Sequence, residues 1–337
     1  MSNSLLLNRS WLLVWLCASS LSRAAETAIL PDSAGTAESP GWLNSAGGWL
    51  ELQRDSFSET VKDSAEGIDA YLARESFDHT LLNESYLKVH LRQRLEKSGA
   101  YSFDANIRAK LKLPNSRRKL KLTFDSDPDD FESIADKNRN QLPGFNSSNT
   151  LKDTAIAGLS VDKMLGKRWH RSYNLGIRLK LPLNPYARVN WTHAKSWSEY
   201  WQSRFKQSFG YFHTDGWKSE TGLSFYRPLN ERLLFQSSSG AQFLDKDNNW
   251  ELYQGLSLHQ RLSVDSAFEH QVGVSGLSRP SMKTNGYWLR TELRHRLHKD
   301  WLFAKVSPEL YFGRVDGFIL APSITFELEI YFGKAPD

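Results

Sequence analysis

Apolar and polar residues alternate with a period of two along most of the chain from Ser85 onward, most clearly between Leu320 and Phe332. Successive side chains of an extended strand point to opposite faces, so this stretch has two different faces. One face carries Ile324, Phe326, Leu328, Ile330 and Phe332, and the other carries Thr325, Glu327, Glu329 and Tyr331. An apolar face toward lipid and a polar face toward a wet interior are typical of a transmembrane β-barrel, because only a closed sheet pairs every backbone group in hydrocarbon.

The alternation predicts an all-β fold, a transmembrane up-and-down antiparallel β-barrel of about fourteen strands. Twelve or sixteen strands stay open as alternatives, because the segments between 181 and 194 are short. An even number returns both chain ends to the periplasm. The predicted strands cover residues 86–95, 101–113, 120–124, 154–163, 172–182, 186–194, 200–211, 217–227, 232–243, 250–261, 267–276, 287–297, 301–312 and 319–332.

Aromatic residues beside the predicted turns distinguish this barrel from a soluble β-sandwich, which would show the same alternation. Trp217 and Trp250 follow turns at one end of the strands, and Trp201 and Trp301 lie beside turns at the other. Two such belts are expected where a barrel wall meets the two lipid headgroup layers. The long polar segment from 125 to 153 is expected to be a structureless loop on the outer rim.

The N-terminal part is expected to direct export of the chain and to precede the barrel, which is predicted over residues 85–334. Residues 1–25 resemble a secretory signal peptide, and residues 26–48 form a flexible lead rich in Ser, Gly, Ala and Pro. Residues 49–84 are predicted as a periplasmic helical segment with a short amphipathic helix over 49–77. This helix either rests on the barrel rim, where a periplasmic partner could bind it, or enters the lumen as a plug.

Composition narrows the chemistry and the partners. Cys17 is the only cysteine and lies in the predicted signal peptide, so the mature chain would have no disulfide, thiolate metal site or cysteine nucleophile. The mean hydropathy of -0.52 excludes a helical membrane protein. The net charge of +5 in an exported chain favours outer-membrane lipid, lipopolysaccharide or an anionic solute over nucleic acid. The outer-membrane insertion machinery is an expected partner, and no cofactor or metal is expected, because the histidines lack ligand spacing.

Several stretches resemble a group of outer-membrane barrel proteins of Gram-negative proteobacteria. The similarity covers most of residues 50–334. It is carried by residues 107–114 with 119–122, residues 251–262, 272–276, 301–310 and 322–333. The resemblance implies the barrel fold and an outer-membrane location. The group brings no established activity, so no catalytic residue is carried over.

The inward positions of the first half of the barrel are predicted to form a basic wall. Its members are Lys88, Arg92, Arg108, Lys110, Lys112, Lys119, Lys121, Arg178, Lys180 and Arg204. Closure should place Glu327 and Glu329 opposite Lys88, His90 or Arg92 across the seam between the first and last strands. These charges either neutralise one another in a narrow lumen or line a path that attracts anionic solutes.

Three functions compete at this point. A channel for small anionic solutes is the leading interpretation, and a structural or assembly protein with a closed lumen is the alternative. A membrane-embedded hydrolase is the third, because Ser257 and His259 share a lumen face and Glu269 lies on the next strand. Adjacent residues are not a triad until their geometry is shown, so the chain is expected not to be an enzyme.

Overall fold

The computed structural model describes residues 54–55, 58–59, 85–97, 99–113, 120–126, 133–139, 155–165, 168–179 and 182–333. The predicted signal peptide (1–25) and flexible lead (26–48) lie outside these residues. So does most of the predicted helical segment, of which only Arg54–Asp55 and Ser58–Glu59 are described, both helical. Within the described ranges, no helix has the length and apolar character needed to cross a membrane.

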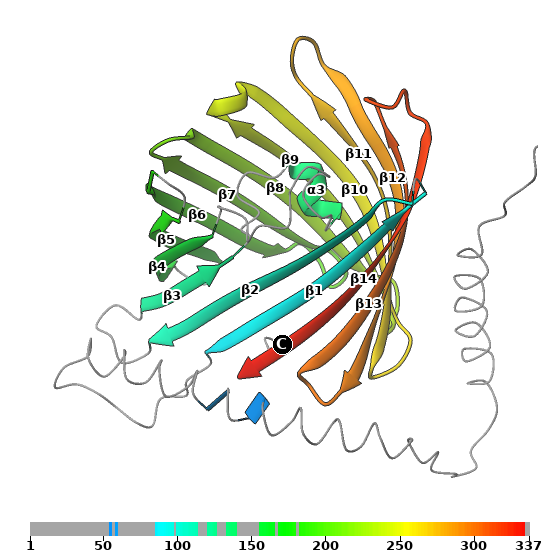
Figure 1. Ribbon diagram of the computed structural model, residues 1–337, viewed down its shortest axis with the longest axis horizontal. Coiled ribbons are helices and arrows are strands. Elements are labelled where there is room, and N and C mark those ends of the chain that lie inside the picture. The colour runs from blue at the N-terminus through cyan, green and yellow to red at the C-terminus, as the bar shows by residue number, and fades with distance from the viewer. Residues whose placement is uncertain are drawn as a thin grey trace, which may run out of the picture. The chain divides into compact units, whose positions relative to one another are not determined.

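Fourteen antiparallel strands form a closed barrel in which each strand pairs with its neighbours in sequence and β14 returns to β1 (Figure 1). The predicted fold class and strand number are therefore confirmed. The strands are β1 (Tyr86–Glu96), β2 (Tyr101–Leu113), β3 (Leu120–Asp125), β4 (Ile156–Leu165), β5 (Trp169–Arg178), β6 (Asn184–Ser196), β7 (Gln202–Phe212), β8 (Gly216–Pro228), β9 (Leu233–Leu244), β10 (Asn249–Arg261), β11 (Ser266–Leu277), β12 (Lys283–His298), β13 (Leu302–Gly313) and β14 (Leu320–Gly333).

Two strand boundaries differ from the prediction by four residues, and the others differ by three or fewer. Strand β5 ends at Arg178 rather than at residue 182. The reason is Pro182, which has no backbone N–H to donate to a neighbouring strand. Strand β12 begins at Lys283, four residues before the predicted start, because the polar run Thr284-Asn285-Gly286 hides the alternation in the sequence.

The two faces of the barrel wall are as different as the alternation predicts. On β14, Phe326 on the outward face is 38% exposed, whereas Glu329 on the inward face is 2% exposed. Large apolar side chains on other strands are also exposed outward, among them Phe103 on β2 and Leu175 on β5. Apolar side chains therefore cover most of the outside, and most of the charged side chains of the strands lie inside.

Inward-facing glycines let aromatic rings lie flat against the inner wall. The Trp288 ring lies over Gly273, where an added Cβ would come within 2.3 Å of it, and Tyr186 covers Gly176 in the same way. Such rings cover backbone that has no side chain of its own and fix the register of the neighbouring strands. Trp288 also stacks on Tyr253, with ring centroids 5.8 Å apart.

The connection between β3 and β4 contains a short helix, α3 (Ile134–Arg139), that lies against the inward faces of β9 and β10 (Figure 1). Ile134 is 4% exposed and packs against Tyr253 and Trp288. Its backbone N–H donates to Glu251 Oε2 at 2.8 Å, and Ser133 Oγ accepts from the Asp136 N–H as an N-cap. The expectation of a structureless outer loop is therefore wrong for this part of the connection.

Candidate functional site: the charged lumen

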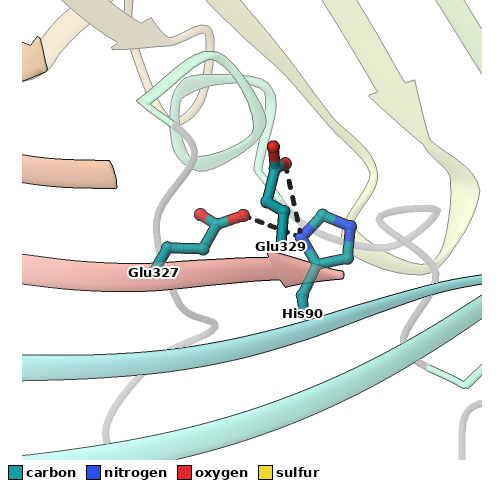
Figure 2. Close-up of side chains that lie close together, drawn as sticks. All are labelled: His90, Glu327 and Glu329. Carbon is teal, nitrogen blue, oxygen red and sulfur yellow. Dashed lines mark hydrogen bonds and ion pairs between the residues drawn. The ribbon is translucent and has the colours of Figure 1, made fainter. Parts of the chain in front are cut away.

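The seam between β1 and β14 is crossed by pairs of opposite charge. Lys88 Nζ lies 2.5 Å from Glu329 Oε1, and His90 Nδ1 lies 2.7 Å from Glu327 Oε1. Arg92 Nε is 3.5 Å from Glu327 Oε2. Figure 2 shows both carboxylates of β14 turned toward the imidazole of His90 on β1. The register places these groups together, because His90 pairs with Glu329 and Arg92 pairs with Glu327. The Lys88–Glu329 and His90–Glu327 contacts run diagonally, each to the residue two positions from the direct partner.

The next strands add more cations to these carboxylates. Lys305 Nζ on β13 lies 2.9 Å from Glu329 Oε1 and 3.5 Å from Glu327 Oε1. Arg294 Nη2 on β12 lies 3.3 Å from Glu329 Oε2. Both carboxylates are buried, and burial makes an ion pair favourable only when its geometry satisfies every charge. We call Lys88, His90, Arg92, Arg294, Lys305, Glu327 and Glu329 the seam cluster.

His90, Glu327 and Glu329 could present three metal-ligand atoms within 4.8 Å of one another. All four carboxylate oxygens already contact a lysine, arginine or histidine of the seam cluster. The cluster also has four Lys and Arg side chains around two carboxylates, so a divalent cation would be repelled by the basic groups nearby. The donor set therefore does not suit a metal ion. Its ion pairs connect the first and last strands.

The predicted basic wall falls into two groups. Most of its described members on β2 to β5 are occupied by nearby acids: Arg108 pairs with Asp125, Lys121 with Asp162, and Arg178 with Asp215. Lys110 and Lys112 follow on inward positions of β2, whereas Lys119 and Lys180 lie outside the described residues. The wall is thus largely neutralised near β3.

Strand β7 is different. Arg204 and Lys206 are exposed to the lumen, and within the described residues neither makes an ion pair. The Arg204 guanidinium lies 5.5 Å from the centroid of the Tyr226 ring on β8. Among the described residues of β7, these two side chains are cations that face the lumen without an acidic partner.

A lumen cavity of about 630 Å³ lies between α3 and the wall formed by β6 to β9. Of the residues that the structure describes, six basic and two acidic side chains line it, and the acidic ones are Asp125 and Glu220. The basic side chains are Arg108, Lys137, Arg188, Arg204, Lys206 and Lys218. The cavity is therefore cationic on balance and lined by hydroxyl and amide groups besides.

Helix α3 forms one side of this cavity, and Lys137 anchors it. Lys137 Nζ lies 2.8 Å from Glu220 Oε2 and also donates to Gln242 Oε1. Ile134 and Lys137 were not predicted as site residues, because both lie in a segment assigned to the outer rim. A six-residue helix is too short to show a periodic pattern, so the only available sign was an isolated Ile in a polar stretch.

The residues proposed for a hydrolase do not form a nucleophile and base pair. His259 Nε2 hydrogen-bonds Gln236 Oε1 at 3.0 Å, and its Nδ1 lies 3.9 Å from Glu269 Oε2. Ser257 is buried on the same strand, and no side-chain hydrogen bond joins it to His259 in the described part of the chain. The expectation that the protein is not an enzyme stays a prediction.

The helical residues before the barrel contact the end of β14. Arg54 donates to the carbonyl oxygens of Tyr331 at 3.4 Å and Gly333 at 3.3 Å. The Gly333 N–H donates to Ser58 Oγ at 2.9 Å. These contacts satisfy backbone groups where the last strand ends.

No protein-family model matches the chain, and no curated protein does. Several solved structures are similar in shape. They include OmpT of Vibrio cholerae, at a TM-score of 0.46 and 6% identity over 74% of this chain and 97% of that one. OccK5 (OpdH) of Pseudomonas aeruginosa has a TM-score of 0.43 and 9% identity over 75% of this chain and 98% of its own. The outer membrane channel DcaP of Acinetobacter baumannii has a TM-score of 0.43 and 7% identity over 74% of this chain and 96% of its own. At these scores the likeness carries no argument about function.

Proposed function

We propose that this protein is an outer-membrane channel for small anionic solutes, with α3 forming its constriction. The observation that carries the proposal is the cationic lumen cavity beside α3, into which Arg204 and Lys206 project without an acidic partner among the described residues. The exposed apolar outer wall supports placement in a bilayer. Both chain ends face the periplasm in this proposal, as an even strand number requires.

Anion selectivity depends on positive charges of the inner wall that have no acidic partner. Fixed positive charge on a wall of low dielectric raises the local concentration of anions, and rings of Lys and Arg select anions in pores. The seam cluster and the Arg108–Asp125 pair hold their charges in contacts within the wall. Arg204 and Lys206 are the groups that a passing carboxylate or phosphate would meet.

Anion preference in planar bilayers tests the proposal. Purified protein should give discrete conductance steps. Across a salt gradient at low ionic strength, the reversal potential should lie closer to the equilibrium potential of the anion than to that of the cation. Lys206→Gln should move that potential toward zero and reduce the anion-to-cation permeability ratio about twofold to threefold, because one accessible charge of the constriction is lost.

Lys195→Gln is the matched control, because Lys195 lies on the outward face of β6 over the Trp197 ring. It removes the same charge outside the lumen and should leave selectivity unchanged. If a bilayer with a high protein load shows no conductance, the protein is not a channel. If Lys206→Gln and Lys195→Gln change the anion-to-cation selectivity equally, the inner wall does not determine it.

A further inference from the structure

The outward face of β7 to β10 carries polar side chains in the middle of an apolar wall. On β7, Gln207 lies between the outward residues Phe205 and Phe209, and on β10, Gln254 lies between Leu252 and Leu256. Ser219 and Thr221 on β8 and Ser237 and Ser239 on β9 have the same outward parity. We call these six residues the outer polar patch: Gln207, Ser219, Thr221, Ser237, Ser239 and Gln254.

The patch consists of two hydrogen-bonded groups that adjoin. Thr221 Oγ1 donates to Gln207 Oε1 at 2.6 Å, and Gln207 Nε2 donates to Ser219 Oγ at 3.3 Å. Ser239 Oγ donates to Gln254 Oε1, and Gln254 Nε2 donates to Ser237 Oγ at 3.2 Å. Ser239 lies diagonally across from Thr221, because Leu223 pairs with Ser239 and Thr221 pairs with Ala241. The two groups therefore form one continuous surface.

Another part of the wall, β13 and β14, provides the contrast. Every outward position of β13 and β14 within the paired region is apolar, including Val306 and Phe326. Lipid tails offer no hydrogen bonds, and polar groups facing them are unfavourable unless they have a partner. A wall that faces lipid all round would not need six polar residues collected on four neighbouring strands.

Hydrogen-bonding capacity is left over on the outside of the patch. The hydroxyls of Ser219 and Ser237 accept from glutamine amides, but within the described residues neither donates to a side chain. Serine, threonine and glutamine each both donate and accept. A second identical patch, turned by a two-fold axis, would offer the acceptors and donors that this one lacks.

We propose that the outer polar patch is the contact surface between two copies of this chain in the membrane. The patch carries no ionised side chain, so two copies can meet without like-charge repulsion. An apolar groove of about 550 Å³, lined by Trp197, Trp201, Phe225 and Phe235, adjoins the patch at Ser237 and extends the contact surface toward the turns. The inference rests on the membrane placement proposed above and does not depend on conduction.

Disulfide trapping in isolated outer membranes tests the inference, since the only native cysteine is Cys17. Ser239→Cys should give a reducible species with the mass of two chains on oxidation. Val306→Cys on the outward face of β13, away from the patch, should stay monomeric, and so should the unsubstituted chain. A monomeric Ser239→Cys would mean that lipid covers the patch, and a link to a different protein would mean another partner; either result overturns the proposal.

A charge placed in the patch gives a second readout. Gln254→Glu puts a carboxylate on the patch of each copy, where association would bury it without a cation, so the self-association constant in detergent should fall at least about tenfold. Gln93→Glu makes the same chemical change on the outward face of β1 and should leave the mass of the complex unchanged. Equal masses of the two variants and the unsubstituted protein would contradict the interface. Single-channel conductance of both variants reports separately on the channel.

Discussion

The seam cluster gives the most quantitative prediction. Glu329 is 2% exposed and accepts from Lys88 and Lys305, whose side chains are 15% and 12% exposed. Glu329→Gln keeps the shape of the side chain but leaves two ammonium groups without that carboxylate. The perturbation therefore removes one charge from the centre of the contact that closes the barrel.

The magnitude follows from burial. Removing one member of a buried ion pair costs about 3 to 5 kcal/mol, because the other charge stays buried and uncompensated. Lys305 keeps Glu327 at 3.5 Å, and lumen water reaches part of both lysines, so we expect the lower end of that range. A loss of about 3 kcal/mol in the free energy of unfolding is a change of more than a hundredfold in the unfolding equilibrium.

Urea unfolding in detergent micelles, followed by tryptophan fluorescence, measures this loss. The double variant Lys88→Met/Glu329→Gln should recover part of the stability, because the unpaired cation is removed as well. Asp300→Asn is the control, since Asp300 pairs with Arg296 while 84% exposed, and its transition should stay near that of the unsubstituted protein. If Glu329→Gln unfolds like Asp300→Asn, the ion pairs do not hold the seam.

Two further predictions concern the lumen. Lys137→Met removes the anchor of α3 on Glu220 and Gln242, so single-channel conductance should rise and its current noise should increase; unchanged conductance would show that α3 does not limit the pore. Gly273→Ala places a Cβ within 2.3 Å of the Trp288 ring and should lower stability by about 1 to 3 kcal/mol through overpacking. Near-ultraviolet circular dichroism should show the displacement of Trp288 from Tyr253, and an unaltered spectrum would contradict this packing.

The barrel could be predicted because a strand between lipid and a wet lumen requires apolar and polar side chains to alternate along its length. Leu328 and Ile330 must face lipid while Glu327 and Glu329 face the lumen, and this period of two fixes which residues share a face. Strand number then followed from counting alternating segments. The end of β5 was less predictable, because Pro182 interrupts a run that otherwise alternates.

For residues inside the lumen, the sequence predicts which face of the strand they lie on but not which partners they contact. Alternation places Arg108, Arg178 and Arg204 inward together, but it does not say that Asp125 and Asp215 neutralise the first two. That difference depends on rotamers and on residues of the connections. The inward fold of α3 depends on long-range packing of Ile134 against β10 and β12, for which the sequence has no periodic sign.

Thiol labelling along β7 tests the central claim, an apolar wall around a water-filled cationic lumen, most directly. Single cysteines at positions 204 to 209 would be treated with a small anionic thiol reagent in intact outer membranes. The account predicts rapid reaction at the inward positions 204, 206 and 208 and little reaction at 205, 207 and 209. Uniform reaction along the strand, or none at the inward positions, would contradict it.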